Sequence, residues 1–398
     1  MKKVLFIFIA ALLLRLCAVY FGIGYDRGLH FFDARDYDRY AVHLLSGEGF
    51  TNGATVASRP PLYPLFLAGC YRLFGHSYLA VRIIQAILGA SLVWPLYGIF
   101  RIHFSERLTL WAIGCVAFHP LLVCYVGNIL SETLALVLLA FFLFVFLREG
   151  GGGGRFRGGL IFGLLLLCRA SFIFLLPILI LFLLREQKKR VIQFVLALSL
   201  TLSPWVIRNA VLLHAFIPLT TNGGTTFWDA NNPEALRDPS KTGLASAWIM
   251  PGRVAQKTGD REIPLSEAEG DRYLYHQGLR FLGDLLRGNP FAFGYLLLRK
   301  LLAAFSMHAG KTILELFLYL ALYGALLPLG LWESRRLAKA PLLLYGVILH
   351  YLLASLIFFG RAKYRMVIEP YLIIFILLGA QTLFRRVDRK TFLWYHKK

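Results

Sequence analysis

The sequence predicts an all-α polytopic membrane protein, and three observations carry this prediction. The chain of 398 residues is 58% hydrophobic and only 16% charged, whereas soluble domains carry about 25% charged residues. Several apolar runs reach the roughly 20 residues that a helix needs to cross a bilayer. Basic residues gather at alternate ends of these runs, as they do in multi-pass membrane proteins.

Ten apolar segments are predicted to cross the membrane. They are 4–23, 78–100, 108–125, 129–147, 158–169, 171–184, 191–212, 313–332, 341–359 and 366–384. The fifth and sixth are short for spanning helices. The first is interpreted as a spanning helix and not as a cleaved leader, because Arg15 interrupts it and no clear small-residue cleavage site follows.

The charge distribution predicts which ends face the cytoplasm. The net charge is +21, but 20 of the 43 Lys and Arg residues and only five of the 22 acids lie in the ends 2–3, 101–107, 148–157, 185–190, 333–339 and 385–398. Fourteen acids lie instead in two loops, 24–60 and 213–298. By the positive-inside rule both loops face outward, and no nucleic-acid partner is expected.

Three regions follow from this topology. Residues 1–212 form an N-terminal membrane region with the first outer loop at 24–60, residues 213–298 form an extracytoplasmic loop, and residues 299–398 form a C-terminal membrane region. Amphipathic helices along the outer membrane surface are expected at 33–46 and 61–74, and a charged helix with an apolar side is expected at 266–286 within the loop 213–298.

Asp33 is the first candidate for chemistry, because it stands in the charged segment 32–50 of an otherwise apolar chain. Charge at a membrane boundary is costly. A carboxylate partly shielded by membrane and aromatic rings would have its pKa raised toward the range of a general base. Two alternatives stay open: Asp33 caps the helix while Asp36 favours the helix dipole, or Asp36 is the base.

Glu132 lies in the sequence NILSETL at the outer junction of the third and fourth spans. An acid directly before an apolar helix also fits a capping box. Topology places Glu132 and Asp33 on the same outer face. Two carboxylates there would divide the roles of base and acceptor positioning, or hold a metal.

Arg361, Lys363 and Arg365 form a basic cluster between the last two spans, on the outer side and against the positive-inside trend. This exception favours the capture of an anionic group, such as the phosphate of a lipid headgroup. The alternative is that Arg365 pairs with Glu369 four residues on. Arg59 is a further cation at the outer edge.

Metal centres and familiar catalytic motifs are not indicated by the sequence. The five cysteines stand singly, and the ten histidines are scattered without metal-ligand spacing. No nucleophile elbow, Walker motif or zinc-protease motif occurs. The five glycines at 150–154 are interpreted as a flexible turn, because a phosphate-binding loop needs a following Lys and Ser or Thr. No metal ligand is therefore assigned.

An ordered series of motifs runs through most of the chain. It comprises DARDYDRYAVHLLSGEGF (33–50), RPPLYPLFLAG (59–69), VRIIQAILGA (81–90), ILSETLAL (129–136), SPWVIRNAVLLHAFIPLTTNGG (203–224) and RAKYRMVIEPYL (361–372). This series resembles bacterial GT-C glycosyltransferases of the family related to protein O-mannosyltransferases and to the lipid A sugar transferases. The resemblance implies a GT-C type bundle of about ten transmembrane helices with amphipathic helices in the first outer loop.

The resemblance also implies partners and a location. The donor would be a sugar linked to polyprenyl phosphate, and the acceptor a glycan, lipid or protein. The enzyme would lie in the bacterial inner membrane with its active site facing outward. Larger relatives carry an extracytoplasmic C-terminal domain, whereas this chain ends at Lys398, which leaves acceptor recognition to the loop 213–298.

Site residues carry over by their place in the motifs. Asp33 matches the acid that serves as catalytic base, and Glu132 matches a second active-site position. The basic cluster and Arg59 match the donor-phosphate site. Tyr37, Asp36 and Tyr63 are the expected substrate contacts.

The expected reaction is a transfer with inversion. Asp33 would deprotonate the acceptor hydroxyl as it attacks the anomeric carbon, and the departing phosphate needs cations more than a general acid. No cofactor is required, although Glu132 would allow a divalent cation, Mg²⁺ or Mn²⁺. A transporter or flippase of lipid-linked saccharides is the alternative, but related halves or matched broken helices are not found in the sequence. A non-catalytic assembly subunit is a third reading, against which the acidic first loop argues.

Overall fold

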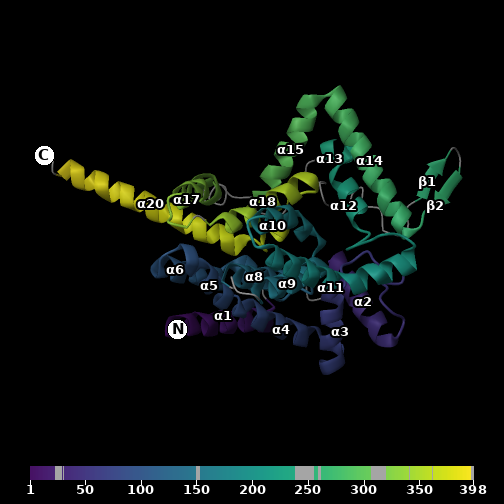
Figure 1. Ribbon diagram of the computed structural model, residues 1–398, viewed down its shortest axis with the longest axis horizontal. Coiled ribbons are helices and arrows are strands. Elements are labelled where there is room, and N and C mark those ends of the chain that lie inside the picture. Colours follow the sequence, from purple (N-terminus) through teal and green to yellow (C-terminus); the bar gives the residue numbers. More distant parts are fainter. Residues whose placement is uncertain are drawn as a thin grey trace.

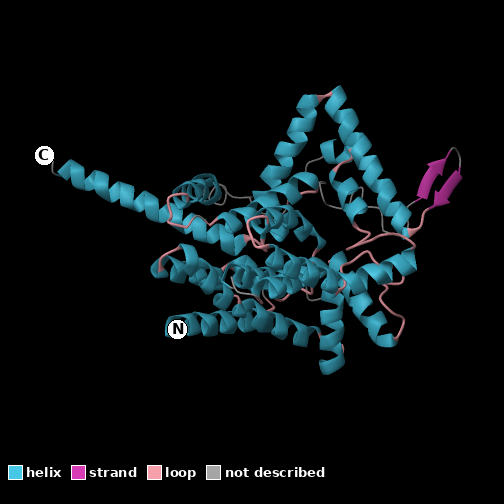
Figure 2. Ribbon diagram, viewed as in Figure 1, coloured by secondary structure: helices cyan, strands magenta, loops and turns pink. Residues whose placement is uncertain are grey.

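The computed structural model describes residues 1–22, 29, 31–148, 153–237, 255–258, 261–305, 320–339, 341–360 and 362–395. Helices dominate this part of the chain (Figure 1, Figure 2). The first half contains α1 (Lys2–Phe21), α2 (Phe32–Ser46), α3 (Leu62–Phe74), α4 (Tyr78–Ser91), α5 (Val93–His103), α6 (Glu106–Phe118), α7 (Pro120–Tyr125), α8 (Glu132–Arg148), α9 (Gly154–Cys168), η1 (Ala170–Leu175), α10 (Leu176–Leu183) and α11 (Lys188–Leu213). The second half contains α12 (Gly223–Ala230), α13 (Pro233–Arg237), β1 (Ala255–Thr258), β2 (Arg261–Pro264), α14 (Glu267–Gly288), α15 (Pro290–Phe305), η3 (Leu320–Leu326), α17 (Leu327–Ser334), α18 (Leu342–Ile357), α19 (Ala362–Arg365) and α20 (Glu369–Tyr395).

The helical character predicted from the sequence is confirmed. Among the described residues, three helical stretches are long and apolar enough to cross a bilayer: Lys2–Phe21, Tyr78–His103 and Lys188–Leu213. Shorter apolar helices lie at Leu62–Phe74, Ala170–Leu183 and Leu342–Ile357. The antiparallel hairpin of β1 and β2 adds a small β element inside the expected loop 213–298.

Some expected spans are interrupted in the structure. The segment 108–125 is divided into α6 and α7, because Pro120 starts a new helix after His119 adopts an extended backbone. The segment 78–100 changes from α4 to α5 at Leu92. The expected span 313–332 lies partly outside the described residues.

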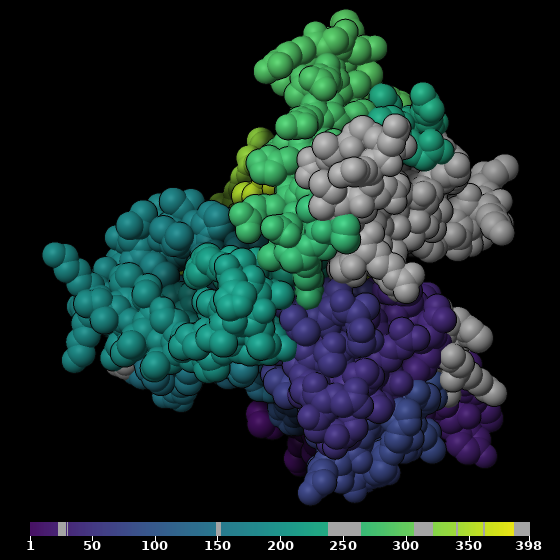
Figure 3. All heavy atoms as spheres, turned by 90° about the vertical axis from the view of Figure 1, so that its right-hand side faces the viewer, coloured from purple at the N-terminus to yellow at the C-terminus, as the bar shows by residue number. Residues whose placement is uncertain are grey.

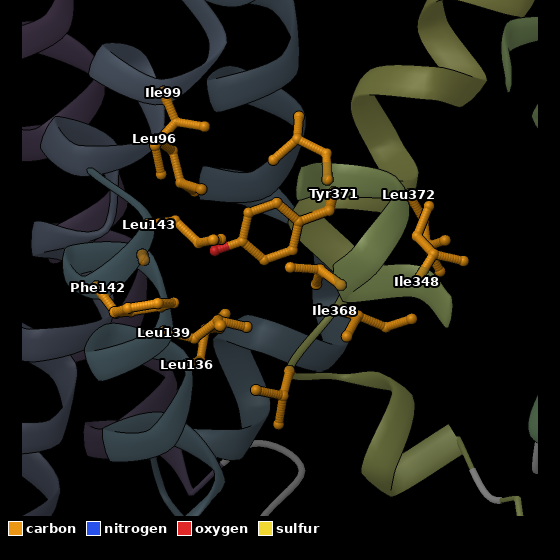
Figure 4. Packing of buried hydrophobic residues seen from close by; sticks show 14 of the residues in the cluster. Leu96, Ile99, Leu136, Leu139, Phe142, Leu143, Ile348, Ile368, Tyr371 and Leu372 are labelled. Atoms are coloured by element: carbon orange, nitrogen blue, oxygen red, sulfur yellow. The ribbon is translucent and has the colours of Figure 1, made fainter. Parts of the chain in front are cut away.

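The main core joins the N-terminal and C-terminal membrane regions. Tyr371 of α20 lies fully buried between Leu96 of α5 and Leu143 of α8 (Figure 4). Helices α17 and α20 pack closely at Gly330 and Gly379: a Cβ on Gly330 would collide with the carbonyl of Phe375 in α20, and a Cβ on Gly379 would collide with the carbonyl of Leu326 at the end of η3. Small residues of this kind let membrane helices approach closely.

The three expected amphipathic helices are present. Segment 33–46 is α2, segment 61–74 is α3, and segment 266–286 is α14. Helix α14 begins at a capping box formed by Ser266 and Glu269. The helix cap of α2 is Phe31, without a side-chain hydrogen bond, so Asp33 lies in the first turn and does not cap the helix.

One end of the bundle gathers segments from across the sequence. Helices α14 and α15 rise from it as a tall pair, and α2 and α3 lie beneath (Figure 1). Seen from that end, the purple and blue early segments, the teal middle segments and the green α14–α15 region meet on one face (Figure 3). Helix α2, which carries Asp33 and Asp36, lies at this end (Figure 1).

Candidate active site

Asp33 is held by two cations that come from distant parts of the chain. Arg59 Nη2 lies 2.8 Å from Asp33 Oδ1, and Lys363 Nζ lies 2.8 Å from Asp33 Oδ2. Burial raises the pKa of Asp33, but Lys363 and Arg59 outweigh that effect and hold the pKa well below its usual range, so the raised pKa predicted from the sequence is wrong for this arrangement. Both carboxylate oxygens are therefore engaged in ion pairs.

Asp36, the alternative base, lies deeper in the same helix. Arg59 Nε lies 2.6 Å from Asp36 Oδ2, and Asn52 Nδ2 donates to Asp36 Oδ1 over 2.5 Å. The side chain of Asp36 is 6% exposed, whereas that of Asp33 is 32% exposed. An incoming hydroxyl group can therefore reach Asp33 more readily than Asp36.

Glu132 joins the same group of charges from the start of α8. It is 2% exposed, with Arg169 Nη1 at 3.0 Å and Lys363 Nζ at 3.7 Å from its Oε1. Lys363 thus lies between two carboxylates. Burial lowers the pKa of Lys363, but the charges of Asp33 and Glu132 outweigh that effect and raise it above its usual value.

Arg169 is a site residue that sequence reasoning missed. An Arg at the end of an apolar span ordinarily extends its side chain to the membrane surface. Arg169 pairs instead with Glu132, and its guanidinium lies 5.1 Å from the ring centre of Tyr364. Helix α9 ends just before Arg169, whose backbone is extended, and this turn points the side chain inward. The presence of Glu132 at the same membrane end was the signal available in the sequence.

Two aromatic residues of the expected substrate site support these charges. Arg59 lies 5.4 Å from the ring centre of Tyr37, and the hydroxyls of Tyr37 and Ser131 share a hydrogen bond of 3.3 Å. The ring of Tyr63 packs edge-on against Tyr37 with centres 4.9 Å apart. Tyr63 is fully buried, and its hydroxyl donates to Gln85. The ring of Tyr63 therefore holds the ring of Tyr37 in place.

The basic cluster of the last outer segment is divided in the structure. Lys363 faces Asp33, whereas Arg365 is 3% exposed and pairs with Glu369 at 3.0 Å. The i to i+4 pairing that the sequence left open is therefore the one observed for Arg365. Arg361 lies outside the described residues.

A divalent cation does not fit the acids as they are arranged. No group of three or more His, Cys, Asp or Glu side chains within the described ranges is placed to hold a metal ion. The oxygens of Asp33 and Glu132 face Lys363, Arg59 and Arg169. A metal would have to displace these cations first.

The comparisons with known proteins agree with this architecture. The model of the dolichyl-phosphate-mannose-protein mannosyltransferase family matches residues 58–208. No curated protein matches the sequence.

Several solved structures are similar, among them the following three. The oligosaccharyltransferase of Archaeoglobus fulgidus, tethered with an acceptor peptide, matches with a TM-score of 0.55 and 14% identity over 97% of this chain and 50% of that chain. The archaeal oligosaccharyltransferase AglB of the same organism, in complex with an inhibitory peptide and a dolichol-phosphate, matches with a TM-score of 0.53 and 13% identity. This match covers 98% of this chain and 51% of that chain. ArnT from Cupriavidus metallidurans, bound to undecaprenyl phosphate, matches with 15% identity over 96% of this chain and 78% of that chain. Its TM-score of 0.44 is too low to carry an argument about the fold.

These matches define a class of protein. The chain is a multi-pass membrane protein with the GT-C fold, as its motifs predicted. It spans about half the length of the oligosaccharyltransferase structures that it matches.

Proposed function

We propose that this protein is a membrane glycosyltransferase that moves a sugar from a polyprenyl-phosphate-linked donor to an acceptor at the extracytoplasmic face of a bacterial inner membrane. The observation that carries the proposal is the position of Asp33 between Arg59 and Lys363. It places a carboxylate, the group needed to accept a proton, beside cations that suit a phosphate.

The comparisons support the proposal in kind. The matched region 58–208 includes Arg59, Glu132 and Arg169. The two similar oligosaccharyltransferase structures are named for an acceptor peptide and for a dolichol-phosphate. A lipid-phosphate donor and a hydroxyl or amide acceptor are therefore the first substrates to test.

The residues suggest a single displacement. The acceptor oxygen attacks the anomeric carbon while Asp33 takes its proton, and the bond from that carbon to the phosphate oxygen breaks with its electron pair. The departing polyprenyl phosphate gains negative charge, which Lys363 and Arg59 would stabilise. One displacement inverts the anomeric centre, and the chemistry needs no divalent cation.

Asp33→Asn tests this function. Wild-type and variant protein in detergent are supplied with candidate polyprenyl-phosphate sugars and acceptors, and both released polyprenyl phosphate and glycosylated acceptor are measured. We expect transfer to fall by about 10²–10⁴. Asp38→Asn is the matched control, because Asp38 lies in the same helix but bonds to Tyr71 and His76 instead. Wild-type transfer by folded Asp33→Asn, or sugar translocation without release of polyprenyl phosphate, would overturn the proposal.

A further inference from the structure

In the part of the chain that the structure describes, the charged side chains of the site pair with one another. Three acids, Asp33, Asp36 and Glu132, face three cations, Arg59, Lys363 and Arg169. Among the described residues, each of these cations already has a carboxylate partner, so a phosphate that binds one of them exchanges with a carboxylate.

We propose that the donor phosphate takes Lys363 from Asp33, so that the carboxylate becomes free to act as a base only when the donor is bound. This inference rests on the proposed function. It assigns Lys363 two successive partners, the carboxylate of Asp33 in the empty site and the phosphate in the loaded site. A base restrained in this way would be available for proton transfer only when the sugar is in place.

Arg59 is less suited to the exchange. It contacts Asp33 and Asp36 at once and lies over the ring of Tyr37. Moving it would leave the buried carboxylate of Asp36 with Asn52 as its remaining partner among the described residues. A buried carboxylate that loses its cation is strongly destabilised.

Lys363 can turn away while its backbone stays in place. Its ammonium group ends a flexible four-carbon chain, and its side chain is 17% exposed. The preceding turn is fixed by α15: Lys300 Nζ donates to the carbonyls of Leu356 and Ile357 at 3.1 and 3.3 Å. Gly360 packs so closely on the backbone of Ala304 that a Cβ would collide with it.

The exchange would change the basicity of Asp33. With Lys363 gone, Arg59 alone opposes the effect of burial, which raises the pKa of a carboxyl. The Lys363 ammonium meanwhile keeps an anionic partner in the phosphate. The proton that Asp33 accepts then comes from the acceptor hydroxyl, as in the displacement described above.

Titration with undecaprenyl phosphate, which carries no sugar and cannot turn over, tests the exchange directly. Lysines of the full chain in detergent are reductively methylated with ¹³C-formaldehyde, and the Lys363 resonance is identified by its loss in Lys363→Arg. We expect the Lys363 resonance to shift as the lipid is added until the binding site is saturated. Without lipid, its position in Asp33→Asn should differ from its position in the wild type. Binding of the lipid, followed by tryptophan fluorescence, with an unmoved Lys363 resonance would overturn the exchange and leave the proposed function intact. Failure of transfer from every polyprenyl-phosphate sugar, with the resonance shifting as expected, would count against the proposed function alone.

The pH dependence of transfer supplies a second readout. In Lys363→Met the acidic limb of kcat/KM for the donor should move to higher pH, because Asp33 is no longer restrained. The KM for the donor should rise about ten- to a hundredfold through the lost ionic contact. Lys363→Arg keeps the positive charge, so the acidic limb of its kcat/KM profile should lie at the same pH as in the wild type. Superimposable pH profiles of wild type and Lys363→Met would contradict the inference.

Discussion

Lys363 Nζ lies 2.8 Å from Asp33 Oδ2, a contact between residues 330 positions apart in the sequence. The pair connects α2 of the first outer loop with α19, directly before the last helix. A substrate bound at this contact would be held by two segments, one early in the sequence and one late in it.

The two acids of α2 should differ in their effect on transfer. Asp36→Asn leaves Asp33 in place but removes one anionic partner of Arg59, so we expect a partial loss of about tenfold, together with reduced stability. Asp33→Asn should lose far more rate, and it should also lose stability, because Lys363 and Arg59 each lose a carboxylate partner. Initial rates and thermal unfolding of both variants are compared. A larger rate loss in folded Asp36→Asn would assign the base to Asp36.

Breaking the pair of Glu132 and Arg169 should be costly. Arg169→Met leaves the buried Glu132 with Lys363 at 3.7 Å as its nearest cation, and we expect a loss of about 3–5 kcal/mol. The double variant Glu132→Gln/Arg169→Met should recover part of this loss, since no buried charge is left alone. Thermal unfolding in detergent measures both. Additive effects of the two substitutions would argue against a direct pair.

Glu267 should control the order of the segment that leads to Arg59. Its carboxylate accepts from the N–H groups of Val56 and Ala57 at 2.8 and 3.0 Å and from the hydroxyl of Thr221. Glu267→Ala should therefore increase hydrogen exchange of peptides covering 55–59. Glu269→Ala removes the capping box of the same helix without touching this segment, and serves as the control. Equal exchange in the two variants would show that Glu267 does not hold the loop.

The packing of α12 on α14 should weaken as the pH rises. Burial raises the pKa of Asp271 to about 6, against the hydrogen bond from the Gly224 N–H, which lowers it. The folded protein therefore binds this proton more tightly than the unfolded chain, whose pKa is near 3.8. The stabilisation is complete below about pH 4 and is lost as the pH passes through about 6, with an upper limit of about 3 kcal/mol.

Asp271→Asn provides the measurement. The amide keeps an oxygen for the Gly224 N–H but cannot ionise. Thermal unfolding should give similar midpoints for variant and wild type near pH 4 and a higher midpoint for the variant at pH 8. A variant that is equally destabilised at both pH values would indicate that Asp271 is ionised throughout.

The sequence by itself determined the class of fold and the segments that matter. Membrane helices must satisfy their backbone hydrogen bonds internally, so runs of apolar residues identify them without knowledge of their neighbours. The amphipathic helices α2, α3 and α14 followed from periodicity, and Asp33, Glu132 and Lys363 followed from charge at the same membrane face. These are local properties of the chain.

Only the tertiary structure decided which charge meets which. Arg365 and Lys363 stand two residues apart, yet one pairs with Glu369 and the other with Asp33, because α19 is a short helix that turns alternate side chains to different neighbours. Arg169 faces Glu132 because α9 ends just before it. An ion pair depends on the distance and direction between side chains, and these are set by the packing of helices far apart in sequence, which no local pattern contains.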